Sequence, residues 1–246
     1  MTELHVQRWG EGPPVLLVHG SVADGTATWA AQRPLAERWR LVVVNRPGFG
    51  ENPPVERVNF EVDAPLVAEL LGDGAHLVGH SYGGVVSLLA AARRPEAVWS
   101  LTVAEPPAFA VASGHLAVAD LVAALRKHWD EAPRDPEAFL RAFLELVGSA
   151  IDLPSPLPPS LQRGAEMLLV ERGPWEAEIP LDELARANFP KLVVSGAHHP
   201  GFEAVCDVLE QRLGAERAVI PGAGHSVQRT GAPFNERLEA FLLSAD

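Results

Sequence analysis

The sequence predicts an α/β fold in which helices cover both faces of a mostly parallel central sheet. Short apolar segments alternate with segments of helical period along most of the chain, as expected when strands are joined by crossover helices. Between about Pro106 and Pro180 the alternation stops, and helical patterns follow one another without strands. The length of 246 residues and the 47% of hydrophobic residues are sufficient for a sizeable buried core.

The expected elements can be assigned in order along the chain. We expect strands at Leu4–Trp9, Pro14–Val18, Leu41–Asn45, Ala75–Gly79, Val98–Ala104, Lys191–Ser195 and Glu216–Ile220. We expect the helices between them at Ala27–Arg38, Phe60–Leu71, Tyr82–Arg93, Phe202–Leu213 and Phe234–Leu243, with further helices at Leu116–Trp129 and Pro136–Val147 in the segment without strands.

A G-x-S-x-G segment, Gly79 to Gly83, lies between one predicted strand and the following helix. This pattern is typical of a nucleophile elbow, in which the strained turn pushes a serine hydroxyl outward. Side chains larger than glycine on either side would collide with the neighbouring strand and helix. Ser81 is therefore the candidate nucleophile.

Two other loops lie where a serine nucleophile needs them. The predicted strand ending at Val18 continues into His19-Gly20-Ser21-Val22, the usual position of a loop that supplies an oxyanion-hole amide. The predicted strand ending at Ile220 is followed by Pro221-Gly222-Ala223-Gly224-His225, which puts a histidine in the last strand-helix loop. The chain order is serine first and histidine last.

These motifs together resemble the α/β-hydrolase family, in its serine-nucleophile, capped, esterase-like branch. The segments HGS, RPGFG, GHSYGG and PGAGH occur in register along nearly all of the chain. The resemblance implies a core domain of residues 1–106 and 181–246, and a helical cap of residues 107–180 inserted after the strand that ends near Glu105. The cap would form the roof of the substrate pocket.

The chemistry of the site follows from the residue types. A serine hydroxyl is a poor nucleophile at neutral pH, and His225 can serve as its general base. Backbone N–H groups of Tyr82 and of either Ser21 or Val22 would hold the oxyanion. We expect His19 and His80 to be structural.

The acid of the triad is where the chain departs from the family pattern. The loop after the strand Lys191–Ser195 carries His199 where most relatives have an aspartate. Glu105, after the strand that follows the nucleophile helix, is the alternative, with Glu203 and Asp207 as weaker candidates. Pro106 would force Glu105 into an extended conformation and so fix where its side chain emerges. A glutamate without a chemical role at the cap hinge is the other interpretation of Glu105.

The resulting prediction is a cofactor-free serine hydrolase of esterase type, acting through Ser81, His225 and Glu105 with an acyl-enzyme intermediate. The substrate would be a small ester, lactone or thioester with a hydrophobic group, and the same machinery could cleave a C–C bond. Apolar cap side chains would favour such a group, namely Phe109, Trp129, Phe139, Phe143 and Trp175. Two other classes stay open: a non-catalytic ligand-binding protein on the same fold, and a non-hydrolytic lyase or haloperoxidase-like enzyme.

The composition of the chain limits the classes of binding partner that we expect. A formal net charge of −12 with scattered basic residues argues against nucleic acid and anionic membrane surfaces. The single cysteine, Cys206, has the pattern of a packed helix residue. Met1 to Val6 has no leader pattern and the chain no long apolar run, so we expect a cytoplasmic protein. No residue spacing suggests a metal or dinucleotide site, and the sequence does not indicate an oligomeric state.

Overall fold

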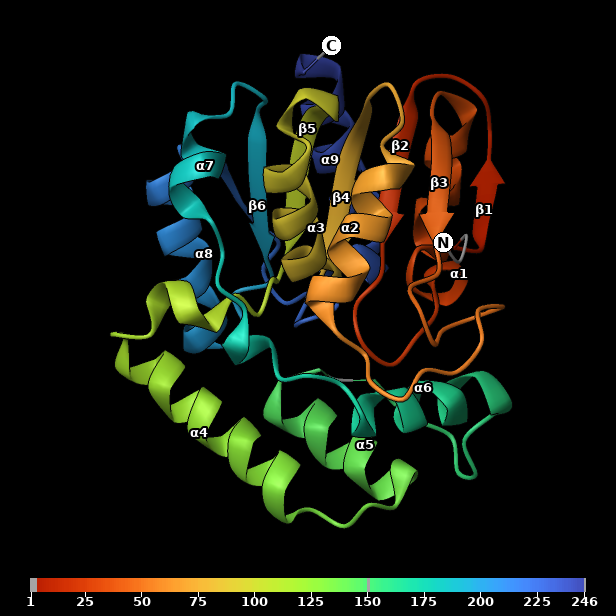
Figure 1. Ribbon diagram of the computed structural model, residues 1–246, viewed down its shortest axis with the longest axis vertical. Helices are drawn as coiled ribbons and strands as arrows, with labels where there is room; N and C mark the ends of the chain where they lie inside the picture. Colours follow the sequence, from red (N-terminus) through yellow and green to blue (C-terminus); the bar gives the residue numbers. More distant parts are fainter. Residues whose placement is uncertain (1–3, 150, 246) are drawn as a thin grey trace.

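The computed structural model describes residues 4–149 and 151–245, and these residues form one sheet with helices on both faces (Figure 1). The sheet has seven strands in the order β1-β3-β2-β4-β5-β6-β7. Only β1 runs antiparallel to its neighbour, β3, and the other pairs are parallel. The predicted fold class is confirmed. Met1 to Glu3, which contribute to the prediction of no leader, lie outside the described residues, as do Ala150 and Asp246.

The strands are β1 (Val6–Trp9), β2 (Pro14–Val18), β3 (Arg40–Val44), β4 (Ala75–His80), β5 (Val98–Ala104), β6 (Lys191–Ser195) and β7 (Glu216–Val219). The α-helices are α1 (Gly25–Thr28), α2 (Phe60–Leu70), α3 (Tyr82–Arg93), α4 (Leu116–Glu131), α5 (Pro136–Leu146), α6 (Pro159–Leu169), α7 (Leu181–Arg186), α8 (Pro200–Leu213) and α9 (Ala232–Ser244). Short 3₁₀ helices are η1 (Ala30–Glu37), η2 (Pro95–Ala97), η3 (Phe109–Ala112), η4 (Pro174–Glu176) and η5 (Val227–Thr230). None of the described helices combines the length and the apolarity that crossing a bilayer requires.

One predicted helix has a different form. The segment Ala27–Arg38 is divided between the short α1 and the 3₁₀ helix η1. Pro34 lies inside η1, and a proline in a helix interior removes a donor and collides with the preceding turn. The helices α6 and α7 were not predicted, because α6 directly follows a proline-rich segment and α7 has only 6 residues.

The sheet separates two hydrophobic clusters, and alternate strand residues contribute to each. Leu16, Leu77 and Val193 point into a cluster that α2, α3 and α8 cover, whereas Leu17, Val78 and Val194 point into one covered by α1, η1 and α9. This is the two-residue period of a strand buried on both faces. A parallel sheet covered in this way leaves the carboxyl ends of its strands available for a site.

The segment 107–180 contributes α4, α5 and α6, which lie beyond the carboxyl ends of β4, β5 and β6 (Figure 1). We propose that it is the cap domain implied by the family resemblance. Its own hydrophobic cluster includes Phe139, Leu144 and Ala165, and Val22 of the loop after β2 packs into that cluster. The core and the segment above it are therefore joined at this loop.

The closest approach between α6 and the loop after β2 gives a stability prediction. A Cβ atom added to Gly164 would lie 1.5 Å from the Val22 carbonyl oxygen. Gly164→Ala should therefore shift the helix or the loop and lower the free energy of unfolding by about 1–3 kcal/mol, measured by thermal and denaturant unfolding. Gly114→Ala is the matched control, because a Cβ there meets nothing within 4 Å. Equal melting temperatures for the two variants would contradict the prediction.

Candidate active site

Ser81 occupies the sharp turn between β4 and α3. Its backbone angles are φ 52° and ψ −128°, a conformation that costs a non-glycine residue about 1–3 kcal/mol. The turn is tight enough to require glycine on both sides. A Cβ on Gly79 would lie 2.4 Å from the Gly83 oxygen, and one on Gly83 would lie 2.3 Å from the His19 oxygen.

His225 reaches Ser81 from the loop between β7 and η5. Its Nε2 atom lies 2.9 Å from Ser81 Oγ, which is hydrogen-bond distance for a general base. His80 stabilises this loop, because its Nε2 donates to the His225 carbonyl oxygen at 3.0 Å. Burial, followed by the proximity of His225, lowers the pKa of His80 to about 3, so His80 stays neutral and acts as a structural donor.

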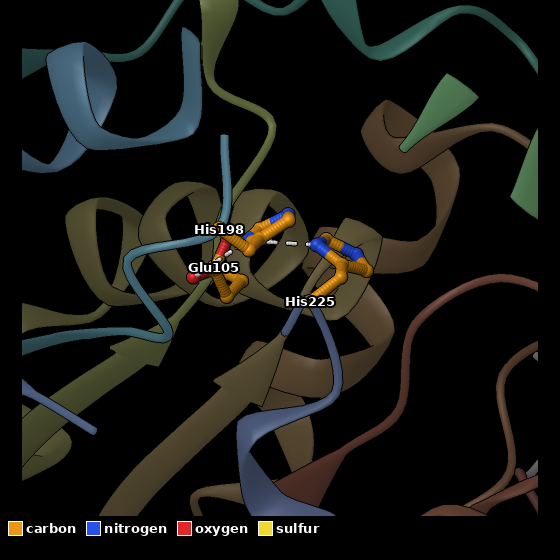
Figure 2. A group of neighbouring side chains, drawn as sticks. All are labelled: Glu105, His198 and His225. Atoms are coloured by element: carbon orange, nitrogen blue, oxygen red, sulfur yellow. Dashed lines mark ion pairs between the residues drawn. The ribbon is translucent and has the colours of Figure 1, made fainter. Parts of the chain in front are cut away.

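Glu105 directly follows β5 and lies beside His225 (Figure 2). Its side chain has no exposed surface, and its Oε2 atom is 3.5 Å from His225 Nδ1. The backbone N–H of Gly196, just after β6, donates to Oε1. Burial alone would raise the pKa of Glu105, but contacts with His198 and His225 lower it to about 2. The carboxylate is therefore ionised and oriented toward the imidazole of His225.

The predicted backbone of Glu105 is wrong. Pro106 was expected to force an extended conformation, but Glu105 has φ 52°, in the left-handed region. Its N–H donates to the Val194 oxygen while its carboxylate accepts from Gly196. These two bonds to the neighbouring strand and loop override the local preference of a residue before proline.

The other candidates for the acid do not reach His225. Glu203 and Asp207 form ion pairs with Arg217, with separations of 2.6 Å and 3.8 Å. His199 caps α8, since its Nδ1 accepts from the Gly201 N–H at 3.0 Å. His198, which the sequence analysis did not single out for the triad, instead points toward Glu105 with Nδ1 3.4 Å from Oε1 (Figure 2).

The candidate oxyanion loop lies beside Ser81. Tyr82 is the first residue of α3, and the N–H of a first helical residue has no partner within its own helix. Ser21 and Val22 both line a cavity with Ser81, and Val22 has φ 77°. Either of their amides remains a candidate for the second donor. The Ser21 hydroxyl donates to Glu171 Oε1 at 2.6 Å.

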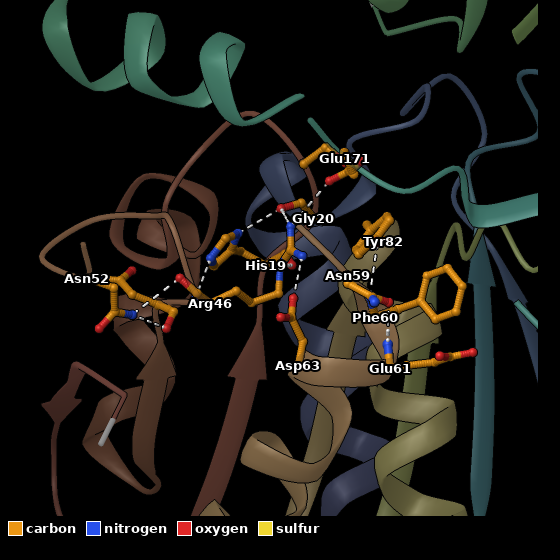
Figure 3. Close-up of polar contacts among 12 residues, drawn as sticks. His19, Gly20, Arg46, Asn52, Asn59, Phe60, Glu61, Asp63, Tyr82 and Glu171 are labelled. Atoms are coloured by element: carbon orange, nitrogen blue, oxygen red, sulfur yellow. Dashed lines mark hydrogen bonds and ion pairs between the residues drawn. The ribbon is translucent and has the colours of Figure 1, made fainter. Parts of the chain in front are cut away.

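A buried arginine that sequence reasoning missed holds this loop (Figure 3). Arg46, from the RPGFG segment, donates through Nε to the His19 oxygen and through Nη2 to the Gly20 oxygen. Its backbone N–H donates to His19 Nε2, so His19 Nδ1 carries the proton that it donates to the Gly20 oxygen. Burial, then Arg46, keeps the pKa of His19 well below its ordinary value.

Arg46 is flanked by two carboxyl groups. Asp63 on α2 accepts from Nη1 at 2.9 Å, and Glu171 Oε2 lies 3.7 Å from Nη2. Burial raises the pKa of Asp63 to about 6 and that of Glu171 to about 7, although Arg46 opposes both shifts. Glu171 lies 150 residues from Ser21 in the chain, and no local sequence pattern marks it as part of the site.

Two hollows meet at Ser81. The outer one, of about 210 Å³, extends past Leu161 and Asp152 to Arg229. The inner one, of about 20 Å³, is lined by aromatic side chains and by Glu171. Four of the five cap aromatics predicted to contact substrate line it, namely Phe109, Trp129, Phe143 and Trp175. Phe139 does not, because it is fully buried in the cap cluster.

Glu105, His198 and His225 are also a group whose possible metal-ligand atoms lie within 4.8 Å of one another. Each group already has a use in the protein. The carboxylate balances two imidazoles and accepts from Gly196, and His225 contacts Ser81. Atoms that could bind a metal ion are therefore already engaged in contacts within the protein.

Comparison with known proteins agrees with this geometry. The profile of the alpha/beta hydrolase family matches residues 15–237, so the chain belongs to the alpha/beta hydrolase family and is a hydrolase. The predicted family and enzyme class are confirmed. The chain is 30% identical over 263 residues to a pimeloyl-(acyl-carrier protein) methyl ester esterase of Aeromonas hydrophila subsp. hydrophila, covering 96% of this chain and 95% of that one.

Solved structures show the same fold. A thermophilic esterase from Thermogutta terrifontis superposes with a TM-score of 0.66 at 25% identity, covering 98% of this chain and 93% of that one. MenH from S. aureus superposes with a TM-score of 0.74, covering 100% and 99% of the two chains. Its 18% identity makes it a likeness of fold alone.

The position of Glu105 predicts the effect of neutralising it. Glu105→Gln keeps the shape of the side chain but removes the charge that orients and stabilises protonated His225. We expect kcat on a p-nitrophenyl ester to fall by about 10³–10⁴-fold, while the circular-dichroism spectrum stays that of the folded protein. Glu203→Gln is the control, because Glu203 pairs with Arg217 instead. Near-normal turnover of Glu105→Gln would remove Glu105 from the triad.

Proposed function

We propose that this hydrolase cleaves small esters through Ser81, His225 and Glu105. The observation that carries the proposal is the 2.9 Å contact of Ser81 Oγ with His225 Nε2, backed by the buried carboxylate 3.5 Å from His225 Nδ1. A neutral imidazole between a hydroxyl and a carboxylate can accept the hydroxyl proton while the carboxylate stabilises the imidazolium that forms.

The reaction has two stages. Ser81 Oγ attacks the ester carbonyl as its proton passes to His225 Nε2, and the carbonyl oxygen becomes an oxyanion facing the amides of Tyr82 and of Ser21 or Val22. Collapse of this intermediate expels the alcohol, which takes the proton from His225, and leaves an acyl group on Ser81. A water molecule then attacks the acyl-enzyme and gives a proton to His225. When this second intermediate collapses, His225 returns the proton to Ser81 Oγ and the carboxylic acid is released.

The shape of the site supports a small apolar group on one side of the ester bond. The inner hollow is narrow and aromatic, and it lies directly beside Ser81. The wider outer hollow would hold the other part of the substrate. Lactones, thioesters and C–C bonds next to a carbonyl could use the same machinery. We place the reaction in the cytoplasm, where reducing conditions suit a protein with a single buried cysteine.

The first test is covalent labelling by a fluorophosphonate, followed by intact-mass measurement. Wild-type protein should gain one adduct rapidly, and Ser81→Ala should gain none, since only an activated serine reacts. Ser87→Ala is the control variant, because Ser87 lies on α3 away from the two hollows. Folded wild-type protein that stays unlabelled would favour the non-catalytic ligand-binding alternative.

Labelled water separates hydrolysis from the lyase and haloperoxidase-like alternatives. Hydrolysis in H₂¹⁸O must place one ¹⁸O atom in the acid product, because water resolves the acyl-enzyme. Mass spectrometry of the products of p-nitrophenyl butyrate measures this directly. Products without ¹⁸O would contradict ester hydrolysis by this site.

We also propose that Glu171 makes the inner hollow selective against anionic groups. Its carboxyl lines this hollow, and its Oε2 atom has no hydrogen-bond partner among the described residues. Because its pKa is raised to about 7, the group is neutral in acid and becomes an anion as the pH rises through that value. A carboxylate in the substrate would then meet a like charge in an apolar pocket.

This selectivity predicts a pH-dependent ratio of rates. The kcat/KM for p-nitrophenyl butyrate divided by the kcat/KM for p-nitrophenyl hemisuccinate should rise several-fold between about pH 6 and about pH 8. Using a ratio cancels the pH effects that are common to both substrates. In Glu171→Gln, which can still accept from Ser21, the ratio should be flat. A flat ratio in the wild type would show that the acyl group does not approach Glu171.

A further inference from the structure

His198 lies between the candidate triad and the cap. It belongs to the loop between β6 and α8, and its side chain is 9% exposed. On one side Nδ1 is 3.4 Å from Glu105 Oε1. On the other side Nε2 is 3.0 Å from the carbonyl oxygen of Val147, the C-cap residue of α5. Its ring therefore bridges the carboxylate and the cap.

Both ring nitrogens of His198 face groups that can only accept a proton. A backbone carbonyl oxygen has no hydrogen to donate, and the ionised carboxylate of Glu105 has none either. A neutral imidazole carries one N–H and one lone pair, so it would direct a lone pair at one of these oxygens. Only the doubly protonated ring donates to both.

The other charged groups near His198 are consistent with a cation. The ring of His225 lies 5.6 Å away and that of His199 lies 6.3 Å away, and Glu203 adds a negative charge from α8. Phe202 packs against the ring at 5.4 Å and contributes no charge. Burial lowers the pKa of His198, but the contact with Glu105 and the Val147 carbonyl outweigh it and the pKa is raised.

We propose that His198 is a positioning residue, an imidazolium that balances the charge of Glu105 and ties this carboxylate to the carbonyl end of α5 in the cap. The inference rests on the proposed hydrolytic function of Ser81, His225 and Glu105. Because two imidazole rings lie beside one carboxylate, the negative charge of Glu105 is shared between His198 and His225. Less of the negative charge of Glu105 is then available to stabilise a proton on His225 than beside an unshared carboxylate.

The sign of the pH dependence follows from the same arrangement. A histidine whose pKa is raised on folding contributes stability below its unfolded value near 6.5, and this contribution is lost as the pH rises through the folded value. Deprotonated His198 must then direct a lone pair at either Glu105 or Val147. The link between the carboxylate and the cap therefore weakens on the alkaline side.

The protonation state can be measured without a substrate. Two-dimensional ¹H–¹⁵N spectra of the histidine side chains, assigned with His198→Gln, should show both nitrogens of His198 protonated at neutral pH. Glu105→Gln should lower the pH at which His198 titrates. A single-tautomer, neutral His198 at neutral pH in the wild-type protein would overturn the inference, whether or not the enzyme hydrolyses esters.

The rate of fluorophosphonate labelling at Ser81, measured across pH, gives the second readout. Removing the cation in His198→Gln should shift the acid limb of this profile upward by roughly one pH unit, lowering the relative rate on that limb by up to about tenfold. The decrease in labelling rate at alkaline pH that comes from deprotonation of His198 should also disappear in this variant. A purely structural role would lower the rate at every pH without moving either limb.

His199→Asn is the matched control for this profile. His199 is the adjacent histidine and caps α8 through Nδ1, a task that asparagine performs well, and it contacts neither Glu105 nor the cap carbonyl. Its pH profile should superpose on that of the wild type. If wild type is labelled and Ser81→Ala is not, but the profile of His198→Gln superposes on that of the wild type, the inference fails while the proposed function stands.

Discussion

The arrangement of the site depends on one buried charge, the carboxylate of Glu105. An ionised carboxyl without exposed surface costs several kcal/mol unless nearby donors and cations compensate for the lost water. The compensation comes from the ends of two other strands. Gly196 and His198 follow β6, and His225 follows β7. The geometry of three loops is therefore fixed by the need to surround one charge, and the same charge orients the imidazole that contacts Ser81.

The cap and the catalytic loops are joined at several independent points. Val22 packs into the hydrophobic cluster of the cap, the Ser21 hydroxyl donates to Glu171, and His198 contacts the end of α5. Two of these points lie on the oxyanion loop and one lies beside Glu105. Because Arg46 fixes the same loop from the core side, a movement of the cap cannot leave the catalytic groups undisturbed. The segment 107–180 is thus joined to the loops around Ser81 and Glu105 through contacts on the loops themselves.

Local patterns in the sequence predicted most of the fold and two of the groups that the structure brings together, Ser81 and His225. The alternation of strands and helices gave the sheet, and the elbow motif and the last loop gave Ser81 and His225, because these features depend on residues adjacent in the chain. Tertiary contacts decided the rest. Hydrogen bonds to β6 and its loop set the backbone of Glu105 against the preference imposed by Pro106. The roles of His198 and Glu171 depend on partners more than fifty residues away, which no local pattern encodes.

The loop after β6 carries histidine rather than a carboxylate, and the charge of this histidine balances that of Glu105. If a carboxylate occupied the loop after β6 as well as Glu105, two like charges would share a buried site and one would take up a proton. An apolar side chain there would leave the Val147 carbonyl without its partner and Glu105 with His225 alone to offset its charge. Histidine at position 198 avoids both problems, since it supplies a cation to the carboxylate and a donor to the cap. The departure noted in the sequence was at His199, which caps α8, whereas the adjacent His198 supplies the positive charge that the buried carboxylate of Glu105 requires.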